Sequence, residues 1–202
     1  MEALCVGTSK LLAELVFLFY HQLIFIPMLY PSDGVPGSVN ADFADYLCEH
    51  KQDIIGDWRD RVRADAAIKP SKSLNTVALT NRLPHIFDDL SLTLRSYRST
   101  LNDEQAVRDV REHSATRWRQ GYELSDVLRE IKHLRSILIY HLNFFESSHP
   151  GNGMAANLFV STIVHRFLDE MVIETTEEFL WAQLALKDDM HRRREQKLQE
   201  ES

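Results

Sequence analysis

The apolar residues between Leu124 and Phe145 recur at spacings of mostly three and four, and this period constrains the fold more than any other feature. An α-helix has 3.6 residues per turn, so residues at this spacing share one side of the helix. Most of the charged residues of the segment fall outside the stripe, which predicts one buried and one solvated face. The stripe consists of Leu124, Val127, Leu128, Ile131, Leu134, Leu138, Leu142 and Phe145.

Both ends of this predicted helix carry boundary signals. Gly121 can adopt positive φ at little cost, which suits a tight turn after a preceding helix. Ser125 is the expected N-cap, because its hydroxyl can accept a hydrogen bond from an amide of the first turn. We expect Tyr122 to pack back onto the preceding helix near Trp118. The string SSHPGNG at 147–153 ends the helix.

The rest of the chain also has the pattern of helices separated by loops. Pro70, Ser71 and Ser73 mark a loop. Pro84 is compatible with a helix because it falls in the first turn, where a missing amide proton costs little. The other predicted helices are Ala41–Ala66, about Asn81–Tyr97, one from a cap at Asn102 or Asp103 to Trp118, and one long helix from Met154 to the C-terminus.

Composition supports an all-α fold with a genuine core. Hydrophobic residues make up 44% of the 202 residues, while 7 glycines, 6 prolines and few alternating runs disfavour an all-β fold. The formal net charge of −7 argues against nucleic acid as a partner. Cys5 and Cys48 provide no disulfide framework and fit a reducing, cytoplasmic location. We expect a globin-like or helical-bundle domain with a long C-terminal helix.

The N-terminal segment is different in character. Residues 11–30, LLAELVFLFYHQLIFIPMLY, are about as long as a helix that crosses a bilayer, but Glu14, His21, Gln22 and Pro27 interrupt them. Three interpretations stay open: a misassigned translation start with the true start near Val39, a membrane segment, or a signal peptide.

A linker follows this apolar segment. Residues 31–40, PSDGVPGSVN, contain two prolines and two glycines, which predicts irregular backbone. The predicted organisation is therefore an N-terminal segment and linker over 1–40, a helical domain over 41–190 and a polar helical tail over 191–202.

The segment from Glu112 to Ile139 resembles a known signalling domain. It combines a His-x-x-x-Arg pair, a Gln-Gly-Tyr break and a periodic helix that carries Arg-Glu and Leu-Arg. This pattern is similar to the N-terminal sensory domain of the RsbR/RsbRD-type co-antagonist proteins of bacterial stress signalling, which also occurs at the front of some bacterial sensor histidine kinases. The resemblance extends over about residues 41–190.

The resemblance implies a non-enzymatic input domain without a cofactor, related to non-haem globins. Its likeness points to six candidate signalling or interface residues: His113, Arg117, Gly121, Tyr122, Glu130 and Arg135. For His113 and Arg117, which share one helical face, a structural alternative is that both stabilise a helix end, because cations are favoured near a C-terminus.

The final helix is the expected dimerisation element. Its apolar residues keep near-heptad spacing, although Thr175 and Glu178 weaken the pattern midway. Homodimerisation is expected near residues 160–190, and the resemblance implies a histidine kinase, a STAS-domain protein or a switch kinase as a further partner. The predicted dimer seam consists of Val160, Val164, Phe167 and Met171.

Two competing hypotheses come from other classes of protein. The first is a membrane-anchored helical protein held by residues 11–30. The second is a metal-dependent helical-bundle enzyme, because Glu130-x-x-His133 and Glu146-x-x-His149 match the unit of di-iron bundles. Both units belong to one predicted helix and its end, whereas di-iron chemistry needs them on different helices. His141 and His165 adjoin apolar runs but are expected to be core or rim residues rather than haem ligands.

Overall fold

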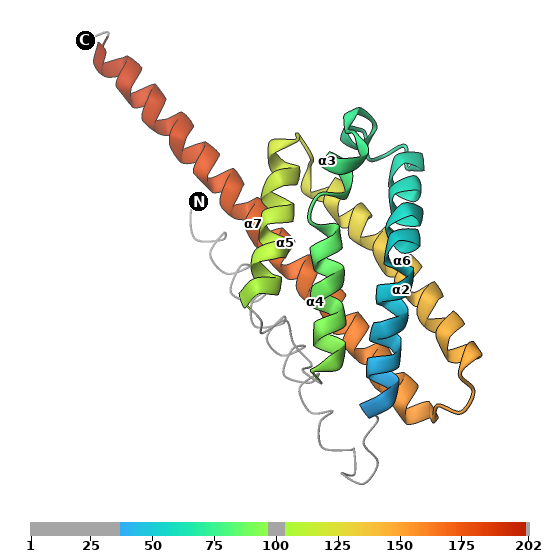
Figure 1. The fold of residues 1–202 in the computed structure, drawn as a ribbon. Helices are drawn as coiled ribbons and strands as arrows, with labels where there is room; N and C mark the ends of the chain where they lie inside the picture. Colours follow the sequence, from blue (N-terminus) through green and yellow to red (C-terminus); the bar gives the residue numbers. More distant parts are fainter. Residues whose placement is uncertain (1–36, 97–103, 201–202) are drawn as a thin grey trace, which may run out of the picture. The chain divides into compact units, whose positions relative to one another are not determined.

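The structure, a computed structural model, describes residues 37–96 and 104–200 (Figure 1). The described residues all belong to one unit of the chain, Pro36–Ser202. Every regular element in these residues is a helix, so the predicted all-α class is confirmed. The elements are α2 (Gly37–Ala64), the 3₁₀ helix η2 (Pro70–Ser73), α3 (Thr76–Thr80), α4 (Leu83–Arg95), α5 (Glu104–Arg119), α6 (Leu124–Ser148) and α7 (Met154–Glu200).

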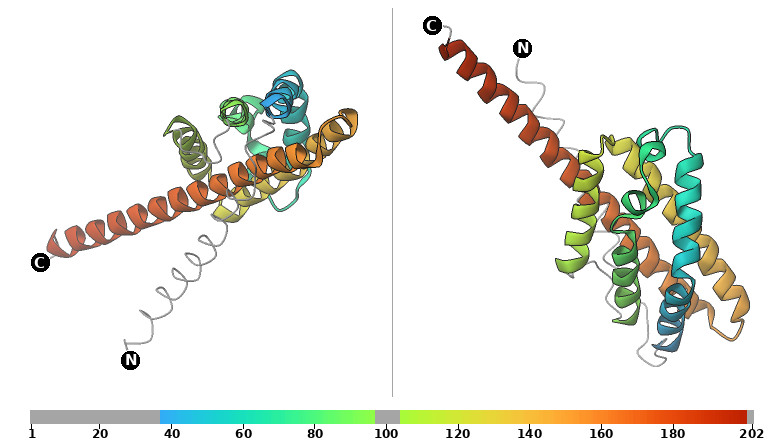
Figure 2. Two further views of the ribbon diagram at one scale, coloured as in Figure 1. Left: turned by 90° about the horizontal axis from the view of Figure 1, so that it is seen from below. Right: turned by 45° about the horizontal axis from the view of Figure 1, so that its top comes forward.

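The helices of this unit pack in two layers. Helices α5, α4 and α2 lie side by side, and α6 and the first half of α7 cross beneath them as an antiparallel pair (Figure 2). The apolar faces of both layers meet in one core, in which Trp58, Phe43 and Phe145 are among the largest fully buried side chains. The result is a helical bundle with a long C-terminal helix, as expected.

Helix α6 has the predicted apolar period, but its N-cap is not the predicted residue. The stripe residues are buried or half-buried against the core. The N-cap is Glu123 rather than Ser125, because Glu123 and Asp126 form a reciprocal capping box. The Glu123 amide donates to Asp126 Oδ2 at 3.0 Å. A carboxylate at each of the two positions satisfies two unpaired amides, and Ser125 remains an exposed residue of the first turn.

The predicted linker over residues 31–40 is partly wrong. Helix α2 already begins at Gly37, so the predicted domain boundary at residue 40 lies inside a helix. Val39 and Asn40 are buried, which ties this first turn to the core. Glycine and serine in a first helical turn look like loop residues in a sequence, although a helix tolerates both there. The apolar segment 11–30, with its membrane interpretation, lies outside the described residues.

The helix predicted from about Asn81 is confirmed as α4, which begins at Leu83, but the short helix before it was not predicted. Helix α3 occupies only Thr76–Thr80, and its N-cap Asn75 accepts a hydrogen bond from the Ala78 amide at 2.8 Å. Asn81 then adopts φ 40°, which ends α3 before α4 begins at Leu83. A helix of five residues is too short to show a period, so the pattern could not reveal it. The predicted limit at Tyr97 and the caps at Asn102 and Asp103 lie outside the described residues.

Helix α7 is one continuous helix, as predicted, but the predicted seam is wrong. The four residues of the predicted dimer seam belong to the chain's own core, so they cannot also form a surface that a second copy covers. They are 1%, 0%, 2% and 3% exposed for Val160, Val164, Phe167 and Met171. The heptad-like spacing reports one apolar stripe, and here the chain's own helices cover it.

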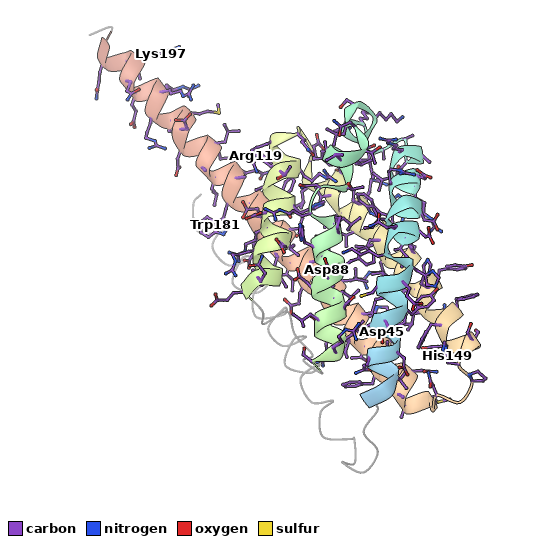
Figure 3. All side chains as sticks on the ribbon, in the orientation of Figure 1. Asp45, Asp88, Arg119, His149, Trp181 and Lys197 are labelled. Carbon is purple, nitrogen blue, oxygen red and sulfur yellow. The ribbon has the colours of Figure 1, made fainter. Side chains whose placement is uncertain are left out.

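Beyond Phe179 the same helix has no comparable cover. Figure 3 labels Trp181 and Lys197 on the part of α7 that extends past the other described helices. A helix of 47 residues is about 70 Å long, which exceeds the other helices. Among the described residues, no helix is both long and apolar enough to cross a membrane.

Candidate functional site: a buried polar cluster

Four of the predicted site residues meet in the interior of the bundle. We call His113, Arg117, Tyr122 and Glu130 the buried cluster; the exposed fractions of these residues are 5%, 0%, 2% and 1%. Charged side chains are almost never this buried unless they are paired. The cluster is therefore the most unusual feature of the described core.

Two helices and the turn between them assemble the buried cluster. His113 and Arg117 are four residues apart on α5 and project from the same face. Gly121 has φ 79° and ends α5, as predicted, so that the chain reverses into α6. The Tyr122 amide donates to the Arg117 carbonyl at 3.0 Å and closes this turn. Glu130 then faces Arg117 from α6.

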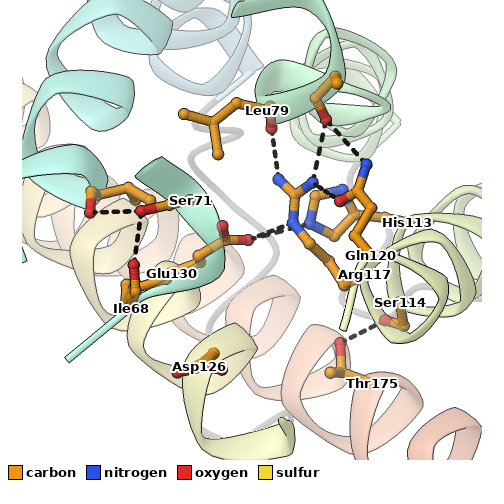
Figure 4. Close-up of polar contacts among 12 residues, drawn as sticks. Ile68, Ser71, Leu79, His113, Ser114, Arg117, Gln120, Asp126, Glu130 and Thr175 are labelled. Atoms are coloured by element: carbon orange, nitrogen blue, oxygen red, sulfur yellow. Dashed lines mark hydrogen bonds and ion pairs between the residues drawn. The ribbon is translucent and has the colours of Figure 1, made fainter. Parts of the chain in front are cut away.

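The guanidinium of Arg117 binds three parts of the fold. Its Nε donates to Glu130 Oε2 at 2.8 Å. Its Nη1 donates to the Ala78 carbonyl at 3.1 Å and to Gln120 Oε1 at 2.8 Å, while Nη2 donates to the Leu79 carbonyl (Figure 4). A guanidinium has five donors in a rigid plane, which suits such a junction. Arg117 thus joins α3, α5 and α6.

Arg117 does contact a helix end, as the structural alternative suggested, but the helix is a different one. Ala78 and Leu79 lie in the last turn of α3, whose carbonyls have no partners within the helix. The positive charge of Arg117 is therefore at a helix C-terminus, where the helix dipole favours it. The helix end is that of α3, whereas the sequence pattern suggested the end of the arginine's own helix.

Tyr122 packs on Arg117 rather than on Trp118. The Arg117 guanidinium carbon lies 5.0 Å from the centroid of the Tyr122 ring. Such a cation–π contact is worth about 0.5–2 kcal/mol, more when water is excluded. Trp118 instead meets the Phe179 ring of α7 edge-on, with 5.5 Å between centroids. The expected packing of Tyr122 near Trp118 is replaced by these two contacts.

The buried cluster has more polar atoms than it has hydrogen bonds. His113 Nε2 lies 3.6 Å from Glu130 Oε2, the oxygen that already accepts from Arg117. Glu130 Oε1, His113 Nδ1 and Tyr122 Oη have no partner of ordinary geometry among the described residues. A buried polar atom without a partner costs about 1–3 kcal/mol. These three atoms could gain hydrogen bonds if the side chains of the cluster moved.

Burial changes the acidity of two members of the cluster. The pKa of His113 is lowered, first because burial disfavours the imidazolium and then because Arg117 repels it, although Glu130 acts in the opposite direction. The pKa of Tyr122 is raised, mainly by burial and then by the negative charge of Glu130. Both shifts favour the neutral forms of the His113 imidazole and the Tyr122 phenol at neutral pH.

A second set of contacts ties the helix of the cluster to α7. Ser114, next to His113, donates from Oγ to Thr175 Oγ1 at 3.0 Å, and both residues are buried (Figure 4). Arg111 Nε donates to Glu174 at 2.6 Å on the more exposed side. Thr175 interrupted the apolar pattern of the last helix in the sequence. This interruption was the only feature of the sequence that pointed to a polar contact at Thr175, and it did not identify Ser114 as the partner.

Arg135 lies apart from the buried cluster. It is on the outer side of α6, where Nη2 donates to Asp169 of α7 at 2.6 Å and Nη1 lies 3.4 Å from His165 Nδ1. Its side chain is 34% exposed. The structure therefore brings together His113, Arg117, Tyr122 and Glu130 beside the Gly121 turn, and places Arg135 in a separate surface pair.

The di-iron pattern and the other histidines have separate partners. His133 pairs with Asp65 at 2.9 Å rather than with Glu130. The His149 ring stacks on Phe145, with 4.3 Å between centroids. The Tyr46 hydroxyl lies 2.8 Å from His141 Nδ1. In the described part of the chain, no group of three or more histidine, cysteine, aspartate or glutamate side chains is placed to hold a metal ion.

Comparisons of the chain with protein-family models, with curated proteins and with solved structures find no match. Each member of the cluster is at most 5% exposed, so a solute cannot reach it without movement of the helices. The cluster can hold α3, α5 and α6 together. A change in the charge or the hydrogen bonds of its members would weaken or strengthen these contacts.

Proposed function

We propose that this chain is a non-enzymatic sensory or regulatory input domain of a bacterial stress-response or two-component-like pathway. It acts in the cytoplasm by homodimerisation and protein–protein contact. The observation that carries the proposal is the division of α7, whose first half is tied to the buried cluster through α5 and whose second half is uncovered. A change in the bundle can thereby alter the surface that a partner meets.

The uncovered half of α7 has the composition of a contact surface. Monomeric proteins expose scattered apolar residues, but a run of them along one projecting helix is typical of an interaction site. A helix with no tertiary cover also needs a partner to gain the stability that packing normally supplies. The exposed apolar residues of this half are Leu180, Trp181, Leu184, Leu186, Met190 and Leu198.

The partners follow from the resemblance of the 112–139 segment to RsbR-type domains. We propose a second copy of the chain as the first partner, and a histidine kinase, a STAS-domain protein or a switch kinase as the recipient of the signal. The relation to non-haem globins is part of the same proposal. The α7 helix is the element that transmits a shift or rotation to the recipient.

A chimeric kinase tests this function directly. Residues 37–200 are joined through α7 to the dimerisation and catalytic core of a histidine kinase that lacks its own input domain, with linkers that sample one helical turn. We expect autophosphorylation to depend on linker length with a helical period. Arg117→Met should change it in at least one register. Activity that is equal for every linker and for both sequences would contradict the proposal.

The homodimer has its own measurement. Sedimentation equilibrium of the full chain at micromolar concentration should give a dimer, and Leu184→Glu should give a monomer because a charge at a packed interface is costly. Val77→Glu is the matched control, since Val77 is 80% exposed on α3, away from α7. Loss of the dimer in the control, or a dimer that survives Leu184→Glu, would exclude this half of α7 as the interface.

A further inference from the structure

We propose that the buried cluster is a proton-responsive latch, in which protonation of His113 places two cations on the single carboxylate of Glu130 and loosens the contacts of α5 with α3 and α7. This inference rests on the proposed function, because it names a signal for the same domain. It stands on the positions of the groups inside the cluster.

The geometry makes one carboxylate, that of Glu130, the object of competition. Glu130 Oε2 accepts from Arg117 Nε at 2.8 Å and lies 3.6 Å from His113 Nε2. While the imidazole of His113 is neutral, Arg117 is the one cation of these two residues beside Glu130. An imidazolium would compete for this carboxylate while Arg117 is 0% exposed and cannot turn to water. Two buried cations with one carboxylate are unfavourable in the way that any unpaired buried charge is.

The surroundings offer the imidazolium little other compensation. From α6, Asp126 is engaged in the cap of its own helix. On α5 itself, buried Asp109 is paired with Arg82 at 3.5 Å. Tyr122, from the turn, is neutral. From α3 the cluster meets only carbonyl groups, which Arg117 already binds.

Helix α7 presents the carboxylates of Glu174 and Glu177 to α5, and both are paired with Arg111 on its more exposed side. Helix α2 contributes Trp58, whose Nε1 donates to the Glu130 carbonyl at 3.1 Å. Helix α7 contributes the hydroxyl of Thr175. Glu130 is thus the carboxylate available to His113, and its second oxygen, Oε1, has no hydrogen bond in the described structure.

The position of the cluster on α5 allows a movement there to reach α7. His113 and Arg117 bracket Ser114 on one helix, and Ser114 bonds Thr175 at 3.0 Å. Thr175 is four residues before Phe179, the last buried apolar residue of α7. Movement of α5 away from its neutral-pH position would break this bond where α7 leaves the bundle. The latch therefore connects a buried proton site with the projecting half of α7.

Amide hydrogen exchange of the full chain at pH 7.5 and 5.5, corrected for intrinsic rates, tests the latch. In the natural sequence we expect exchange over residues 76–80 and 173–179 to be about tenfold faster at pH 5.5, because this pH is about one unit below the ordinary pKa of a solvated histidine, near 6.5. His113→Gln, which cannot be protonated, should remove this acid response. His85→Gln, at an exposed position, and His141→Gln, at a second histidine with a lowered pKa, should retain it.

A second measurement covers the case in which His113→Gln fails to fold. The imidazole signals of the natural protein are followed by NMR from pH 7.5 to 5, and the His113 signal is assigned through scalar correlations with its own backbone. We expect it to titrate together with the amide signals of residues 173–179. A His113 signal that stays neutral to pH 5, or an acid response that persists in a folded His113→Gln variant, would overturn the latch.

The two proposals can fail separately. If the chimeric kinase responds to Arg117→Met at pH 7.5 while exchange shows no acid response, the domain is an input module whose signal is not the proton. If the chimera never responds, the proposed function is wrong, whatever the exchange rates show.

Discussion

Two arginine–carboxylate pairs join α6 to its neighbours, Arg117–Glu130 to α5 and Arg135–Asp169 to α7, and they have nearly equal lengths but very different surroundings. Arg117 and Glu130 are 2.8 Å apart, and their side chains are 0% and 2% exposed. Arg135 and Asp169 are 2.6 Å apart, and their side chains are 34% and 63% exposed. The shorter pair is the weaker one in physical terms, because water and salt screen it while its long side chains lose entropy. Burial decides the energetic importance of a pair, and distance does not.

The buried pair also carries a greater penalty when it is broken. Removal of one partner leaves the other as an uncompensated charge in a medium of low dielectric constant, which costs about 3–5 kcal/mol. Removal of one partner of an exposed pair leaves a solvated charge, which costs almost nothing. The variants below test this difference, from the largest expected effect to the smallest.

Glu130→Ala should cause the largest loss. It leaves the Arg117 guanidinium buried beside its carbonyl partners with no carboxylate, so we expect the free energy of unfolding to fall by about 3–5 kcal/mol. Urea denaturation followed by circular dichroism measures the change. The double variant Arg117→Met/Glu130→Leu removes both charges and should recover most of it, because apolar side chains of similar size often replace a buried pair. A single-variant loss below about 1 kcal/mol would contradict the burial argument.

Gly121→Val should have the second largest effect. Gly121 has φ 79° in the turn that brings Arg117 opposite Glu130, and a β-branched residue resists this conformation by about 1–2 kcal/mol. A Cβ at this position would meet no atom within 4 Å, so the expected loss is backbone strain alone. Gly56→Ala is the matched control: it also has open space but lies inside α2, and should stabilise by about 0.5–1 kcal/mol. Equal effects of the two variants would contradict this account of the turn.

The Asp65–His133 pair is intermediate between the two arginine pairs, with side chains 19% and 24% exposed. The hydrogen bond from His133 holds the pKa of Asp65 below its usual value near 3.8, with a smaller contribution from the Ala67 amide. A lowered folded-state pKa means that the unfolded chain binds the proton more readily. The stabilisation is therefore complete above pH 3.8 and is lost as the pH falls through the folded-state value.

Asp65→Asn should accordingly lower the free energy of unfolding at pH 7 by less than about 1 kcal/mol, because the pair is partly solvated. In urea titrations the difference from the natural sequence should shrink as the pH falls below 3.8. Asp60→Asn is a comparison at a carboxylate that is bonded only to its neighbour Arg59 at 2.8 Å. A difference for Asp65→Asn that grows as the pH falls would show the sign to be wrong.

Arg135→Ala should have the smallest effect of the series. The exposed pair with Asp169 is expected to contribute about 0.2–1 kcal/mol at low salt and less at 0.5 M salt. Thermal melts at two salt concentrations measure this contribution. A loss that exceeds that of Gly121→Val and is insensitive to salt would remove the distinction between the buried and exposed pairs.

Local pattern predicted most of the helices and few of the partners. The period of α6, the stop at 147–153, the Gly121 turn and the continuity of α7 follow from residues that are close in the sequence. The cap at Glu123, the short α3 and the early start of α2 did not follow, because each depends on a choice among polar side chains that a period does not encode.

The candidate site divides in the same way. The sequence determined that His113 and Arg117 share one face of a helix and that Gly121 reverses the chain after them, because both are consequences of local backbone geometry. Only the tertiary structure decided that Glu130 is inside while Arg135 is outside, and that the apolar stripe of α7 faces its own bundle up to Phe179. Burial depends on which helix covers a face, and helices far apart in the chain supply that cover.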